Sequence, residues 1–90
     1  MRSVQPGDIV LSLAGHDKGR LYLVIGQEKD KLLLADGRIR TLARPKAKSQ
    51  KHVRPTAHIE ALPATDKEIR TTLAQAAQTA PEKGDQLGER

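Results

Sequence analysis

The chain has 90 residues and a formal net charge of +5, with no cysteine and one aromatic residue, Tyr22. This length allows one small domain with a modest core, and the missing cysteines exclude disulfides, thiolate metal sites and cysteine nucleophiles. With a single aromatic residue, recognition of bases by stacking on aromatic side chains is nearly excluded.

The first 35 residues predict three short strands separated by turns. Residues 9–13 (IVLSL) follow the turn signal Pro6-Gly7, and residues 20–27 (RLYLVIGQ) follow a loop with two glycines. Residues 31–35 (KLLLA) come after a short polar turn. Each run is short and largely apolar, a pattern that favours strands over helices.

Two further strands are expected later in the chain. Residues 38–42 alternate polar and apolar side chains, as a half-exposed strand does. Asp36-Gly37 precedes them and predicts a tight hairpin, in which both central residues take a positive φ. Residues 56–62 supply a short closing strand. Four or five short strands joined by tight turns predict a small barrel, because closure removes exposed sheet edges.

The most basic segment is residues 38–54 (RIRTLARPKAKSQKHVR), with seven Lys or Arg residues, one His and no acid. Residues 1–54 carry a charge of +7, against −2 for residues 55–90. Between residues 46 and 54 only Ala47 and Val53 are apolar, so we predict a basic loop, disordered between Pro45 and Gln50 before binding. Such a loop suits a polyanion, because neutralising phosphates releases counterions; a solvated charged loop is the ordinary alternative.

A C-terminal helix is predicted within residues 63–81. Thr65 and Glu68 have the spacing of a capping box, followed at helical spacing by Ile69, Leu73, Ala76, Ala77 and Ala80. This apolar stripe is thin, so the helix is expected to dock lightly on the barrel or to fray. Pro81 ends it, and residues 82–90 are expected to be disordered. The predicted division is therefore a barrel over 1–62, a helix over 63–81 and a tail over 82–90.

No arrangement of residues in the sequence predicts catalysis or a metal site. His16 and Asp17 are adjacent, but no serine is tied to them by sequence. The three histidines are spaced too irregularly for a metal motif, and no phosphate-binding glycine pattern occurs. We expect a protein that is not an enzyme and that needs no metal or cofactor.

Residues 7–35 carry the most specific signal. Gly7-Asp8 precedes the first predicted strand, Gly19 precedes the second, and Val24 and Ile25 lie within it. This arrangement resembles the KOW motif of ribosomal proteins and transcription elongation factors. Gly19 takes the place of the hallmark glycine, where a positive φ and a close backbone approach favour glycine. An ordinary glycine-containing hairpin is the alternative.

The resemblance extends to residues 51–56 (KHVRPT) and covers about residues 4–62. In their order, these segments look like those of bacterial KOW-domain RNA-binding proteins related to the L14e-type ribosomal proteins of archaeal and eukaryotic large subunits. The resemblance implies an all-β fold, a small SH3-like (KOW) barrel with a basic loop extension and a short C-terminal α-helix. It also implies binding to RNA, with ribosomal RNA of the large subunit as the expected partner.

The same resemblance indicates which cations contact RNA. The candidate RNA-binding residues are Lys18, Arg20, Arg38, Arg40, Arg44, Lys46, Lys48, Lys51, His52 and Arg54. Arg38 and Arg40 could equally form the solvent face of a strand. Lys46, Lys48 and Lys51 are expected to contact phosphate, as the densest cationic patch with nothing local to pair with. His52 either contacts RNA or braces the turn around residues 51–54.

The leading hypothesis is a non-catalytic, cytoplasmic RNA-binding module, monomeric when free, with no membrane or small-molecule partner. No apolar stretch approaches the roughly 18 residues of a membrane span, and the N-terminus lacks the apolar region of a signal peptide. A second hypothesis is an SH3-like protein–protein adaptor of the transcription or translation machinery. It would need an exposed apolar or aromatic patch, for which the sequence offers only Tyr22. A reader of double-stranded DNA is less favoured, because no recognition helix is evident.

Overall fold

The computed structural model describes residues 4–79. They form strands β1 (Asp8–Ser12), β2 (Leu21–Glu28), β3 (Lys31–Ala35), β4 (Lys46–Ser49) and β5 (Val53–His58), a 3-10 turn η1 (Gln50–His52) and one helix, α1 (Asp66–Thr79). The predicted helix stop at Pro81 and the predicted disordered tail at 82–90 lie outside the described residues. No helix in residues 4–79 is long and apolar enough to cross a membrane.

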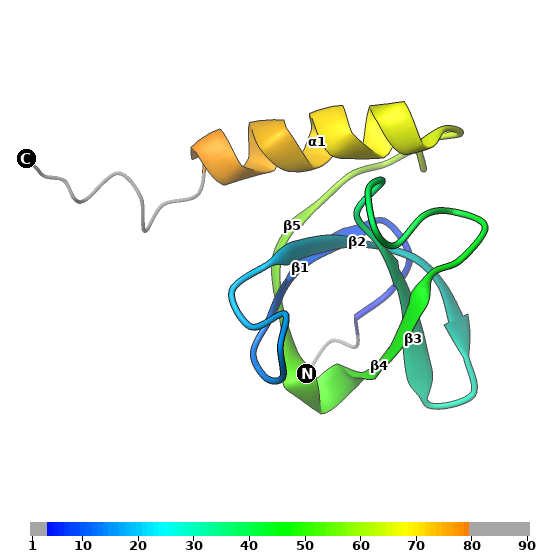
Figure 1. The fold of residues 1–90 in the computed structure, drawn as a ribbon, viewed down its shortest axis with the longest axis vertical. Helices are drawn as coiled ribbons and strands as arrows, with labels where there is room; N and C mark the ends of the chain where they lie inside the picture. Colours follow the sequence, from blue (N-terminus) through cyan, green and yellow to red (C-terminus); the bar gives the residue numbers. More distant parts are fainter. Residues whose placement is uncertain (1–3, 80–90) are drawn as a thin grey trace, which may run out of the picture.

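The five strands form one antiparallel sheet in the order β4-β3-β2-β1-β5. In a flat sheet, the outermost of five strands would lie about 19 Å apart. Here the three residues of η1 join them, and a 3-10 turn of that length rises only about 6 Å. The sheet therefore curls into the ring seen in Figure 1. The predicted β-rich fold with one helix is confirmed, while β4 and β5 share no hydrogen-bonded ladder and the sheet is not closed.

Successive side chains of each strand point to opposite faces of the sheet, so the core consists of two clusters. An inner cluster fills the curl and consists of Val4, Val10, Tyr22, Val24, Leu32, Leu34 and Val53. The outer cluster joins Ile9, Leu23 and Ala35 of the sheet to Ile69 and Leu73 of α1. Figure 1 shows α1 lying outside the ring. Because Ile69 is fully buried, the helix docks on the sheet through the thin stripe that the sequence predicted.

The start of α1 follows the predicted capping box. Thr65 Oγ1 accepts a hydrogen bond from the Glu68 N–H at 3.1 Å. The Glu68 carboxylate in turn accepts from the Ala64 N–H at 2.9 Å, one residue before the expected donor. The first bond satisfies a backbone donor that a helix start leaves without a partner, and the second ties the residue before the cap to the first turn.

Residues 38–42 do not form the predicted strand. Asp36 Oδ1 accepts from the N–H groups of Arg38 and Arg40, both at 2.9 Å, while the Arg40 carbonyl accepts from the Asp36 and Gly37 N–H groups. Of the two central residues, Gly37 has a positive φ and Asp36 does not, so the predicted tight hairpin does not form. The backbone N–H groups of this loop therefore bond to the Asp36 side chain and not to a neighbouring strand.

The same loop is fastened to α1. The Leu42 N–H donates to Asp66 Oδ1 at 2.8 Å, and Arg70 Nη1 donates to the Gly37 carbonyl at 2.7 Å. A methyl group on Gly37 would overlap the Asp66 carbonyl oxygen. The loop over residues 36–45 is therefore held in place although it belongs to no strand.

The predicted disorder between Pro45 and Gln50 is also wrong, because residues 46–49 form β4. The closing strand begins at Val53, earlier than the predicted residue 56, and ends at His58. Pro55 lies in this strand, where it is tolerated because β5 is an edge of the sheet.

Candidate nucleic-acid interface

The basic residues that the sequence grouped together separate into three sets in the structure. Lys46 and Lys48 lie on β4 with their side chains on the inner face. A second set surrounds the end of β1, and a third lies on the loop over residues 36–45. Figure 1 shows that loop beside the first turn of α1, on a different side of the ring from the loop that joins β1 to β2.

Lys46 and Lys48 point into the curl of the sheet. They lie opposite Leu34 and Leu32 in the β3–β4 pairing, and directly opposite residues share a face. Both ammonium groups reach one carboxylate: Lys46 Nζ lies 2.8 Å from Asp17 Oδ2, and Lys48 Nζ lies 3.2 Å from Asp17 Oδ1. As predicted, these lysines have no acid near them in the sequence, but a carboxylate distant along the chain pairs with both.

Asp17 is the centre of this buried cluster, with its side chain only 8% exposed. Besides the two lysines, it accepts a hydrogen bond from Ser12 Oγ at 2.8 Å. Burial alone would raise the pKa of Asp17, but the hydrogen bonds from Lys46, Ser12, Lys48 and Tyr22 outweigh it and hold the pKa well below its usual range. The carboxylate is thus kept ionised as the counter-charge of β4.

Tyr22 belongs to the same buried cluster and donates a hydrogen bond to Asp17. Burial, and after it the hydrogen bond to the Asp17 carboxylate, raises the pKa of Tyr22 to about 12. Because Tyr22 is buried, the one aromatic side chain of the sequence is not part of an exposed binding surface. Sequence reasoning missed this cluster, although Asp17 is the only acid between residues 9 and 27.

A second set of cations gathers where β1 ends. Ser12 pairs with Val53 and Leu11 with Arg54, while the Ser12 N–H donates to the Arg20 carbonyl and the Leu13 N–H to the His52 carbonyl, both at 2.9 Å. Three chain segments therefore meet here. We call their five exposed basic residues the cationic end: Lys18, Arg20, Lys51, His52 and Arg54. Within residues 4–79 none of them forms an ion pair.

Gly19 shapes the loop that carries two of these cations. Its φ of +90° confirms the positive value expected at this position. Its N–H donates to the Ser12 carbonyl at 2.9 Å, which closes the loop. Apart from its two neighbours in the chain, no described residue has an atom within 4 Å of the position that a Cβ on Gly19 would take. The expected close approach of another backbone segment is therefore absent.

The third set lies on the loop over residues 36–45, which we call the arginine loop. It presents Arg38, Arg40 and Arg44, none of which pairs with a carboxylate within the described part of the chain. The hydrogen bonds to Asp66 and Arg70 place it against α1. The expectation that Arg38 and Arg40 lie on a strand is wrong, and the structure does not bring them to the cationic end.

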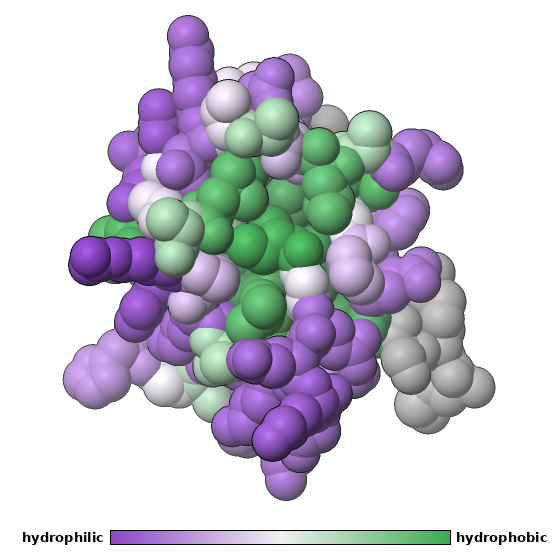
Figure 2. All heavy atoms as spheres, turned by 90° about the vertical axis from the view of Figure 1, so that its right-hand side faces the viewer, coloured by the Kyte–Doolittle hydropathy of each residue, from purple (hydrophilic) through white to green (hydrophobic). Residues whose placement is uncertain are grey.

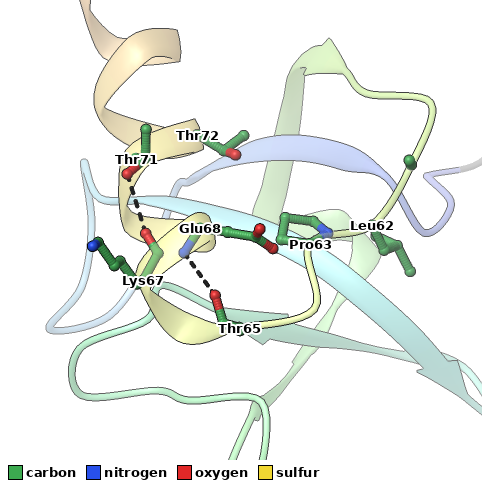
Figure 3. Close-up of a pocket in the computed structure, with 8 residues that line it drawn as sticks. Leu62, Pro63, Thr65, Lys67, Glu68, Thr71 and Thr72 are labelled. Atoms are coloured by element: carbon green, nitrogen blue, oxygen red, sulfur yellow. Dashed lines mark hydrogen bonds between the residues drawn. The ribbon is translucent and has the colours of Figure 1, made fainter.

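Two other features of the described residues contain polar groups. His58 Nδ1 lies 2.7 Å from Oδ1 of the buried Asp8 and ties the end of β5 to β1. An open groove beside the first turn of α1 is shown in Figure 3, where Thr65 and Glu68 are engaged in capping. No group of three or more His, Asp or Glu in residues 4–79 could hold a metal ion.

A scan against protein-family models and a search of curated proteins both find no match to this chain. Its function is therefore inferred from its own residues and their placement.

Proposed function

We propose that this chain is a non-catalytic RNA-binding module whose cationic end contacts the phosphates of structured RNA. The observation that carries this proposal is the convergence of five exposed, unpaired basic side chains from three separate segments within the described residues. Neutralising phosphates releases condensed counterions, so such a set binds RNA largely independently of base sequence.

The chemistry of the cationic end favours backbone recognition over base recognition. The buried position of Tyr22 leaves no exposed aromatic side chain for stacking in residues 4–79. Arg20 and Arg54 offer planar guanidinium groups that can bind a phosphate through two hydrogen bonds, while Lys18 and Lys51 supply point charges. Double-stranded RNA is recognised mainly through its shape, phosphates and 2′-hydroxyls, which suits this composition.

The identity of the RNA is proposed from the resemblance to KOW-domain proteins. The curled sheet of five antiparallel strands, with a 3-10 turn before the last strand, supports an SH3-like barrel of that type. We propose ribosomal RNA of the large subunit, in the cytoplasm, as the partner of a monomeric chain. Lys46 and Lys48 are left out of the proposed contacts because Asp17 engages both ammonium groups.

The test is the salt dependence of binding of the full chain to ribosomal RNA by filter retention. If about five phosphates are contacted, raising the salt from ~50 to ~200 mM should weaken binding by roughly a few hundredfold. Replacing Lys51→Glu and Arg54→Glu together should abolish binding at the higher salt. Lys67→Glu, an exposed change on α1, serves as the matched control and should retain most of the affinity. Salt-independent binding, or an equal loss in the control, would refute the proposal.

A further inference from the structure

Beyond α1, a strip of apolar side chains extends over the outer face of the sheet and onto the loop over residues 36–45. Ile25 and Leu42 are partly buried against the outer cluster. Leu33 and Ala47 face each other across β3 and β4 and point outward, because the neighbouring Leu32 belongs to the inner cluster. We call these four residues the outer strip. Ala47 is exposed and the other three are half-buried.

Figure 2 shows the face that carries this region. Apolar side chains gather in its middle and polar side chains surround them. In Figure 1 the same side of the molecule carries the β2–β3 hairpin, β4 and the arginine loop. The hypothesis of a protein–protein adaptor requires an apolar patch at the surface. The sequence alone did not indicate one, and this face has one.

The arginine loop contributes Leu42 to the outer strip, and it also carries Ile39, the most exposed large apolar side chain of the described residues. Ile39 is 70% exposed and lies between Arg38 and Arg40. The Asp36 carboxylate fixes the backbone on both sides of it, through the two 2.9 Å bonds. Ile39 is thus presented on a preformed loop, and a preformed surface loses less conformational entropy when a partner binds.

The composition of this surface fits a protein partner better than other partners. Phosphates offer nothing to half-buried aliphatic side chains such as Ile25 and Leu33. A flat bilayer would reach the protruding Ile39 but not those recessed side chains. A second copy would bring the same arginines, which have no carboxylate partner among residues 4–79, and the same net charge of +5 against the surface. A protein partner accommodates both parts of this surface, because the core of a protein interface is apolar and arginine is enriched in such interfaces.

We propose that the outer strip and the arginine loop bind a protein segment that carries aliphatic side chains next to carboxylates. The aliphatic groups of the partner fill the strip and contact Ile39. Its carboxylates pair with the guanidinium groups of Arg38, Arg40 and Arg44, which accept them in a two-hydrogen-bond geometry. This inference is independent of the proposed RNA contact, and because the two surfaces are separate, the module can hold RNA and protein together.

Site-specific crosslinking of the full chain in its native host tests this proposal. The photoreactive residue p-benzoylphenylalanine is introduced by Ala47→p-benzoylphenylalanine in the strip, and by Ala57→p-benzoylphenylalanine on β5 as the matched control, since both alanines are exposed on edge strands. We expect protein adducts from position 47 only, which survive RNase and disappear when Arg38→Glu and Arg40→Glu are added. Mass spectrometry of the adduct should map the crosslink to a segment with aliphatic and acidic residues.

A synthetic peptide of the mapped segment then gives the affinity. Arg40→Glu should weaken its binding at least tenfold, whereas Lys51→Glu at the cationic end should leave it unchanged. The proposal is overturned by adducts that RNase removes, by adducts to a second copy or to residues 80–90 of the same chain, or by no adduct at position 47. It is also overturned if the chain binds vesicles of phosphatidylcholine and phosphatidylserine and Ile39→Ala abolishes that binding.

Discussion

Strand β4 and the segment that follows it, η1 and the start of β5, carry cations from one continuous basic run, but these cations have opposite environments. On β4, Lys46 and Lys48 turn into the curl of the sheet and pair with the buried Asp17. A few residues later, Lys51 and Arg54 are exposed and have no ion-pair partner within residues 4–79. Charge density along the chain does not distinguish the two stretches. What distinguishes them is whether the side chain turns into the curl of the sheet, as on β4, or is exposed outside it.

The comparison shows what makes an inward lysine acceptable. A buried cation is costly unless it is paired and hydrogen-bonded. Here the partner comes from the loop between β1 and β2, 29 residues before Lys46 and 31 before Lys48. The cations of β4 are therefore engaged within the fold, while Lys51 and Arg54 have no ion-pair partner among residues 4–79.

Removing the buried carboxylate of Asp17 should destabilise the fold, because the inward lysines of β4 depend on it. Asp17→Ala leaves two inward ammonium groups without their counter-charge, and breaking such a buried pair costs about 3–5 kcal/mol. Urea unfolding of the purified chain measures the loss. Asp30→Ala, at an exposed turn, is the control and should stay within about 0.5 kcal/mol of the unchanged protein. Equal unfolding free energies for the two variants would contradict the role given to Asp17.

Alanine substitutions at Gly37 in the arginine loop and at Gly19 in the β1–β2 loop should differ in their cost to stability. Gly37→Ala forces a positive φ on alanine and overlaps the Asp66 carbonyl oxygen, so we expect a loss of about 3 kcal/mol. Gly19→Ala meets no neighbouring atom, and only the backbone conformation is strained, at about 1 kcal/mol. Thermal unfolding of both variants measures the difference. A larger loss for Gly19→Ala would refute this distinction.

Alkaline pH should weaken the buried cluster through Tyr22. Its pKa is raised to about 12 in the folded protein, so the folded state holds the phenol proton more tightly than the unfolded chain, whose phenol has a pKa of about 10. This stabilisation is complete below about pH 10 and is lost as the pH rises to about 12. The unfolding free energy should fall by about 2–3 kcal/mol over this interval. Urea unfolding across this interval measures it. In Tyr22→Phe this fall should be absent.

The sequence predicted those parts of the fold that depend on local pattern. The strands near residues 9–13, 20–27 and 31–35 and the Thr65–Glu68 capping box were all identified from short-range spacing. Asp36-Gly37 was misassigned, because the side chain of Asp36 bonds the backbone of its own loop. β4 was missed because its lysines face inward, the reverse of the usual alternation.

For the site, the sequence identified the basic residues but not how they divide. Lys48 and Lys51 look alike in the sequence, and only contact with Asp17, far away along the chain, separates them. The meeting of Arg20, His52 and Arg54 likewise depends on pairing of β1 with β5. Long-range contacts of this kind require the curl of the whole sheet and have no local sequence signal.

The most direct test of the division compares Lys48→Met with Lys51→Met, in the full chain, for both unfolding free energy and the salt dependence of ribosomal RNA binding. Lys48→Met should lower the unfolding free energy and leave the slope of log affinity against log salt unchanged. Lys51→Met should leave the unfolding free energy unchanged and reduce that slope by about one, the contribution of one phosphate contact. If Lys48→Met instead reduced the slope by about one without a loss of stability, the division between paired and free cations would be wrong.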